Sequence, residues 1–106
     1  MVNEFMNEKI KAEILEAIND SFKEILGESG TKAIYYYFQV QTGMKVEEAI
    51  ESPEIFVSFL RNIFKAGSQI LERRIIEKLC DKFSQNLEEE KNIDLTNLIK
   101  KLLKKK

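Results

Sequence analysis

Ile34-Tyr35-Tyr36-Tyr37-Phe38 places five large apolar or aromatic side chains next to one another. Successive residues of a helix are about 100° apart, so a helical run of this kind turns such side chains toward every side of its axis. A strand would bury the same run on both faces of a sheet, so the neighbouring segments must decide. No second convincing strand exists to pair with it, and we therefore predict a helix from about residue 31 to 41. We expect this helix to be central in the fold and covered on every side.

The rest of the chain carries the period of amphipathic helices. The predicted helices cover residues 5–26, 31–41, 53–66, 68–87 and 94–104, with a short helical turn at 46–51. A turn at residues 27–30 separates the first two, with Ser29 or Thr31 as the cap of the second. Ser52-Pro53-Glu54 is a strong helix start, because serine is a preferred N-cap and proline suits the first helical position. Ser68 and Asp94 are further candidate caps.

These elements predict an all-α fold, a compact bundle of five or six helices. At 106 residues the chain fits a single domain spanning residues 1–106, with a basic amphipathic helix at about 94–104 at its end. The apolar stripes that we expect to face the core are Ile10, Ile14, Ala17, Ile18, Phe22, Ile25 and Leu26, then Ile55, Phe56, Phe59, Leu60, Ile63 and Phe64, then Leu71, Ile75, Ile76, Leu79, Cys80, Phe83 and Leu87, and finally Leu95, Leu98, Ile99, Leu102 and Leu103.

Composition narrows the class of protein. Charged residues make up 33% and hydrophobic residues 43%, as in soluble globular proteins. A net charge of -1 argues against a general nucleic-acid binder, and no apolar run approaches the roughly 18 residues of a transmembrane segment. Cys80 is the only cysteine and the N-terminal segment is too charged for a secretory signal, so we expect a cytoplasmic protein. Abundant Glu, Lys and Ile are thermophile-like, although an AT-rich genome would produce the same usage.

Catalytic chemistry has little support in the sequence. The chain has no histidine, which excludes Ser-His-Asp and Cys-His arrangements, and one cysteine offers no recognisable zinc set. No GxxxxGK[ST] run is present to hold a phosphate. Cys80 falls on an apolar stripe, where a buried, inert thiol is the simplest interpretation. The acidic pairs and clusters at Glu47-Glu48 and Glu88–Glu90 are typical of solvated surface. We therefore predict a protein that is not an enzyme and has no cofactor or metal site.

Two groups of side chains are candidates for binding. Tyr35, Tyr36 and Tyr37 span about 200° of a helix, and buried phenols need hydrogen-bond partners, so at least one should reach the surface, a pocket or a subunit interface. Core packing of two, with the third reaching water, is the plain alternative. An interface is preferred to a pocket because tyrosine is enriched at interfaces. The second group is a candidate basic patch, made of Lys100, Lys101, Lys104, Lys105 and Lys106. The leucine face of their helix can dock on its own bundle or on a second subunit.

Residues 26–79 also carry a spacing of small and aromatic residues that resembles a small archaeal helical family, the Nitrosopumilus output domain type. The residues concerned are Leu26-Gly27, Ser29-Gly30, Ala33, Tyr36-Tyr37-Phe38, Gly43, Pro53-Glu54, Phe56, Leu60, Ile63-Phe64, Gly67, Ile70-Leu71-Glu72 and Leu79. Lys65 stands where that pattern has a glycine. The resemblance implies an archaeal source and a signalling or interaction role, and it brings no catalytic motif.

The leading hypothesis is a non-enzymatic helical interaction or signalling domain of the output type. We expect it to self-associate, most simply as a homodimer, with the aromatic helix supplying part of the contact; a different protein partner is left open. Nucleic-acid binding through the C-terminal lysine cluster is the alternative. A small-ligand-binding domain with a tyrosine-lined pocket is a further one.

Overall fold

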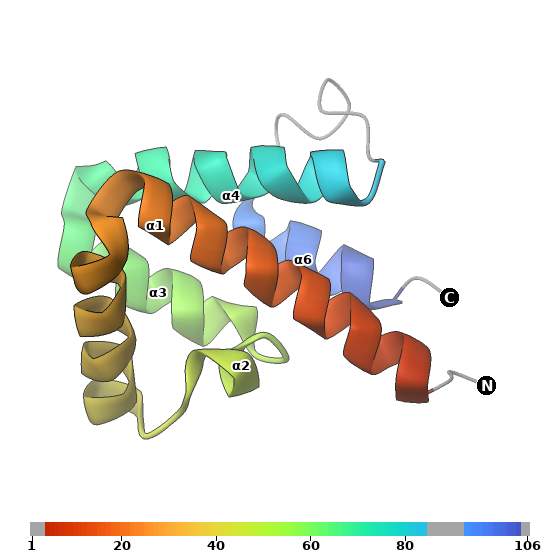
Figure 1. The fold of residues 1–106 in the computed structure, drawn as a ribbon, viewed down its shortest axis with the longest axis horizontal. Coiled ribbons are helices and arrows are strands. Elements are labelled where there is room, and N and C mark those ends of the chain that lie inside the picture. Colours follow the sequence, from red (N-terminus) through yellow and green to blue (C-terminus); the bar gives the residue numbers. More distant parts are fainter. Residues whose placement is uncertain (1–3, 85–92, 105–106) are drawn as a thin grey trace.

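A computed structural model describes residues 4–84 and 93–104, and these two ranges are helical with no strand. The elements are α1 (Glu4–Thr42), α2 (Val46–Ala49), α3 (Pro53–Phe64), the 3-10 turn η1 (Lys65–Gly67), α4 (Ser68–Lys82) and α6 (Leu95–Lys104) (Figure 1). The predicted all-α class is therefore confirmed. The end of the helix predicted at 68–87, the acidic cluster Glu88–Glu90, and Lys105 and Lys106 lie outside the described residues.

Helix α1 bends sharply at Gly27, so its two halves run in different directions (Figure 1). Gly27 has φ 78° and ψ 176°, a conformation that is essentially restricted to glycine. A Cβ at Gly30 would lie 2.9 Å from the Cβ of Leu26, so the close approach of the two halves also requires a glycine there. The predicted break between two helices at Gly27 is confirmed, but residues 28–30 of the predicted turn are helical, because Gly27 alone redirects the chain. Thr31 is not an N-cap; its hydroxyl donates to the carbonyl of Gly27, 2.7 Å away.

The first half of α1 lies across the other helices and contacts α2, α4 and α6 (Figure 1). Its apolar stripe is buried, since Ile14, Ala17, Ile18 and Phe22 have almost no exposed surface. Full burial of an isoleucine or phenylalanine side chain contributes about 1.5–3 kcal/mol. Ile25 departs from the stripe, because the bend at Gly27 turns the chain away before its side chain can be covered.

Helix α6 docks on its own bundle through the predicted leucine face. Leu95, Leu98, Ile99 and Leu102 are fully buried against α1, α3 and α4. The amide of Asn97 donates to the carboxylate of Asp94, at 2.9 Å, so the predicted N-cap is confirmed. The leucine face of α6 therefore packs on its own chain, and not on a second subunit.

The second half of α1 lies at one end of the bundle (Figure 1), and the prediction of a central, fully covered helix is wrong. Phe38 is fully buried, whereas Tyr36 is 72% exposed and Val40 is 61% exposed. The reason is that the first half of α1 and helices α3, α4 and α6 already cover one another's stripes. Only the side of residues 28–42 that carries Phe38 is needed to close the core.

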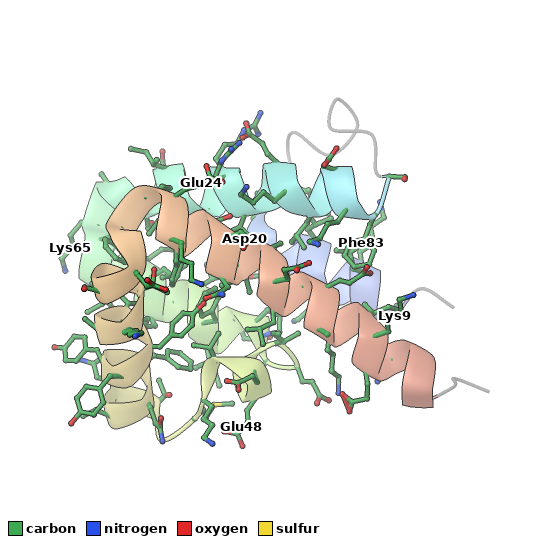
Figure 2. The ribbon with its side chains drawn as sticks, viewed as in Figure 1. Lys9, Asp20, Glu24, Glu48, Lys65 and Phe83 are labelled. Carbon is green, nitrogen blue, oxygen red and sulfur yellow. The ribbon has the colours of Figure 1, made fainter. Side chains whose placement is uncertain are left out.

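The starts of α3 and α4 differ from expectation in their caps. Pro53 is the first residue of α3, as predicted, but the hydroxyl of Ser52 makes no capping hydrogen bond. Ser68 is buried as the first residue of α4, and Gly67 occupies the cap position instead. The joint between the helices is made by Lys65, which has φ 52° and ψ -129°, a backbone conformation that favours glycine. Its side chain points away from the fold (Figure 2).

Candidate interaction surface

The three tyrosines end in different environments, and Tyr35 belongs to the interior. Its hydroxyl is 3.0 Å from the side-chain oxygen of Asn19, and its ring centroid is 5.7 Å from that of Phe22. Burial, followed by the nearby charges of Glu47 and Asp20, raises the pKa of Tyr35 to about 12. Tyr35 therefore ties the two halves of α1 together across the bend, and its phenol stays neutral.

Tyr36 and Tyr37 face outward together with two smaller side chains. Ala33, Tyr36, Tyr37 and Val40 are all exposed and lie at positions i, i+3, i+4 and i+7 of one helix. We call these four residues the tyrosine face. This spacing gives one continuous stripe along a helix. No charged residue occurs between residues 33 and 44, so the four residues form an uncharged stripe, which the exposed Lys32 borders one helical turn before Tyr36.

The tyrosine face rests on a layer of aromatic rings from α3. Tyr37 meets the ring of Phe59 at 6.1 Å in an edge-on arrangement, and the buried Phe38 meets the same ring at 5.1 Å. Phe38 also contacts Phe56, with centroids 6.0 Å apart. Edge-to-face pairs of this kind contribute roughly 0.5–1.5 kcal/mol beyond their buried area. The exposed tyrosine ring of residue 37 is therefore held in place from below.

An open groove of about 350 Å³ continues this surface between α1 and α3. It is lined by Gln41, Thr42, Glu54, Ile55, Ser58, Phe59 and Asn62. Ile55 is 39% exposed here, although the sequence predicted a core position. Tyr37 reaches the groove only through its contact with Phe59, so this groove does not have the tyrosine lining that a ligand pocket was expected to have.

A larger open groove, of about 660 Å³, lies between the end of the first half of α1 and α4. Ile25 and Ile70 form its apolar part, and they are 42% and 67% exposed. Glu24 faces α4 beside them (Figure 2) and pairs with Arg74 at 2.9 Å and with Lys78. Hydrogen bonds from Lys78 and then Arg74 lower the pKa of Glu24. The charges bordering this groove are therefore largely neutralised within the fold.

The predicted basic patch is partly engaged in the fold. Lys100 pairs with Glu54 at 2.7 Å, and its hydrogen bond lowers the pKa of that carboxyl. Lys101 and Lys104 are exposed on the same helix, opposite the buried leucines. The five lysines are thus not one free cluster, because at least Lys100 is committed to joining α6 and α3.

Among the described residues there is no group of three or more acidic or cysteine side chains that could hold a metal ion. Cys80 is 3% exposed, and its predicted burial is confirmed. No helix within the described ranges is long and apolar enough to cross a bilayer.

Comparison with known proteins finds no matching family model, curated protein or solved structure. The resemblance to output domains therefore stays a prediction. Within the part of the chain that the structure describes, the tyrosine face and the two grooves are surface features that packing of the core does not explain.

Sequence reasoning found Tyr36 and Tyr37 but missed Ala33 and Val40. The signal was available, since the four residues have helical spacing and stand in a stretch without charge. The expectation that this helix is covered on every side hid the stripe, because every apolar residue of a fully covered helix would be a core residue.

Proposed function

We propose that this protein is a non-enzymatic helical interaction domain that self-associates through the tyrosine face. The observation that supports it is the exposure of Ala33, Tyr36, Tyr37 and Val40 as one uncharged stripe on a helix. Contiguous exposed apolar stripes are uncommon on monomeric soluble proteins and mark interaction sites.

The chemistry of the stripe suits a helix as the partner. Apolar residues at i, i+3, i+4 and i+7 form the ridge that a second helix accepts between its own side chains. Tyr36 and Tyr37 supply large contact area with few rotatable bonds, which is why tyrosine is frequent among residues that dominate binding energy. Phe59 beneath Tyr37 limits the ordering that binding requires.

A second copy of the chain is the partner that we favour. In a two-fold dimer each residue near the axis faces itself or a close neighbour, so a charged stripe would repel its own copy. The tyrosine face carries no charge, and it can therefore pair with itself without unpaired ions. The proposal includes a signalling role, an archaeal source and a cytoplasmic location, which are supported by the resemblance to output domains and by the single cysteine.

Light scattering of the wild-type protein over micromolar concentrations tests the proposal. We expect a dimer that dissociates on dilution, and a monomer at the same concentrations for the double variant Tyr36→Ser/Val40→Ser. Losing two central contacts at about 1.5 kcal/mol each weakens dimerisation on the order of 100-fold.

Ile70→Ser is the matched control, because Ile70 is as exposed as Tyr36 and Val40 but lies beside the other groove. It should leave the dimer unchanged. A wild-type protein that is monomeric throughout, or a double variant that dimerises as the wild type does, contradicts the proposal.

A further inference from the structure

The backbone changes direction in α1 at a single residue. Helix α1 runs for 39 residues, and Gly27 is the only one with non-helical backbone angles. Rotation of that single residue into the helical region would join the two halves into a straight helix. The two halves are thus helices that continue one another in sequence and are separated only by the conformation of a glycine.

A straight α1 does not fit within one copy of the fold. At 1.5 Å per residue it would be about 58 Å long, whereas the molecule extends 36 Å along its longest axis. The first half would have to leave its seat on α4 and α6, which exposes Ile14, Ile18 and Phe22 to water. The surface that fits those side chains is the same seat on another copy.

We propose that two copies of this chain, when they fold together at high concentration, exchange the first half of α1, residues 4–26, by straightening at Gly27, and so form a domain-swapped dimer; chains that fold separately keep the bent form. Swapping of this kind arises where a short hinge joins an element to its body. It is separate from pairing through the tyrosine face, because the exchanged element is the other half of α1.

The exchange keeps the contacts that the first half makes with the rest of the fold. Ion pairs of Glu16 with Lys82, of Glu24 with Arg74 and of Lys11 with Glu51 form again between chains. The hydrogen bond between Tyr35 and Asn19 does the same. The two copies differ from two monomers only around the straightened hinges. Ile25 is two residues before Gly27, and Ile70 lies on α4 in the same groove as Ile25. Both side chains are exposed and can make new contacts around the straightened hinge.

Replacement of Gly27 should shift the equilibrium between the bent monomer and the exchanged dimer toward the dimer. A side chain at φ 78° and ψ 176° is strained, while the same residue is unstrained in a straight helix. Gly27→Ala therefore disfavours the bent copy and favours exchange. Gly43→Ala is the matched control: Gly43 also has a positive φ, of 74°, and an added Cβ would have nothing within 4 Å at either glycine. Gly43 ends α1, so its replacement strains the chain without creating a straight helix between two bodies.

Cross-linking between chains identifies exchange directly. Lys11 in the first half of α1 pairs with Glu51 in the rest of the fold. One chain therefore carries Lys11→Cys and a second chain carries Glu51→Cys. Both chains also carry Cys80→Ala, which removes the native thiol. Chains carrying Gly27→Ala are unfolded, mixed, refolded together and treated with a short bismaleimide. Exchange predicts a covalent dimer of one chain of each kind. The same mixture with Gly43→Ala, or chains mixed after folding, should give at least tenfold less.

Absence of that dimer from folded Gly27→Ala protein overturns the inference. If Gly27→Ala does not fold, the wild-type backbone with the same cysteines decides: refolding at high concentration must give more interchain product than mixing after folding, and equal yields overturn the inference. Adding Tyr36→Ser and Val40→Ser leaves the cross-link unchanged, so failure of the tyrosine-face proposal is read separately.

Discussion

Truncation of Phe38 to alanine gives the sharpest test of how the bent helix is seated. The side chain has no exposed surface, and its ring meets Phe59 at 5.1 Å and Phe56 at 6.0 Å. Phe→Ala in a core costs about 3–5 kcal/mol, from the lost transfer free energy and the cavity that remains. Both neighbouring rings are held on α3, so the cavity cannot collapse easily. We expect a loss of about 4 kcal/mol in the free energy of unfolding.

Tyr36→Ala is the control, since it removes an aromatic ring two residues earlier in the same helix. Tyr36 is 72% exposed, and alanine is the better helix former, so its effect on the monomer should lie within about 0.5 kcal/mol. The two substitutions are alike in size and opposite in direction around the helix axis. Their difference therefore measures which side of the helix faces the core.

Urea unfolding followed by circular dichroism gives both free energies, and it is run at several chain concentrations because the proposed dimerisation would also stabilise the folded state. In a domain whose total stability is about 5–15 kcal/mol, Phe38→Ala should lower Tm by roughly 15–30 °C. Equal losses for the two variants, or a small loss for Phe38→Ala, would show that the second half of α1 does not pack as described.

Three further predictions concern single side chains. The phenol of Tyr35, whose pKa is raised to about 12 by burial, is expected to ionise last in an absorbance titration, and Tyr35→Phe should remove that step. Because its folded pKa exceeds the unfolded value of about 10, its contribution to stability is complete below pH 10 and disappears as pH rises toward 12. The pKa of Glu24 is lowered by Lys78 and Arg74, so its contribution to stability is present above the unfolded pKa of about 4.5 and is lost as pH falls through the folded pKa. Glu24→Gln should therefore flatten the acid side of the curve of stability against pH. An unchanged curve contradicts this prediction. Lys65→Gly should raise stability by about 1 kcal/mol in urea unfolding, since it relieves a positive φ, and a loss of stability would argue that Lys65 is not strained.

Much of the fold was predictable because amphipathic stripes are local signals. The spacing of Ile14, Ile18 and Phe22 fixes which side of that helix is apolar wherever the helix goes, and all three are buried. The same holds for Leu98 and Leu102 in α6, although the sequence could not say whether their face meets this chain or another. Fold class and most of the buried face of each stripe thus follow from periodicity, whereas Ile25 and Ile55 are exposed.

The placement of the aromatic segment was not predictable from periodicity. Gly27 was expected to begin a turn between two helices, and its φ is positive. Its ψ of 176° sends the chain directly into the next helix, and that angle decides where residues 28–42 lie. Neighbouring residues do not specify ψ at a glycine, because glycine tolerates nearly all of them.

The exposure of the three tyrosines also depends on the ψ angle of Gly27, which the sequence does not specify. Tyr35, Tyr36 and Tyr37 are chemically identical and about 100° apart in turn, so only the direction of the helix distinguishes them. In the structure the first is tied to Asn19 and the second and third face outward. Sequence could state that one phenol must leave the core, but it could not say which.

The presence of a tyrosine at position 36 is what the fold alone leaves unexplained. Phe38 and Tyr36 are about 200° apart on the helix, so burial of Phe38 forces residue 36 toward solvent whatever its identity. The fold therefore accepts lysine or glutamine at position 36 as readily as tyrosine, and either would be more soluble. A large aromatic side chain at a position where the core does not need one, next to an exposed Val40, is better explained by contact with another surface than by stability. The aromatic run thus combines a residue that closes the core, Phe38, with an exposed one, Tyr36, for which we propose contact with another surface.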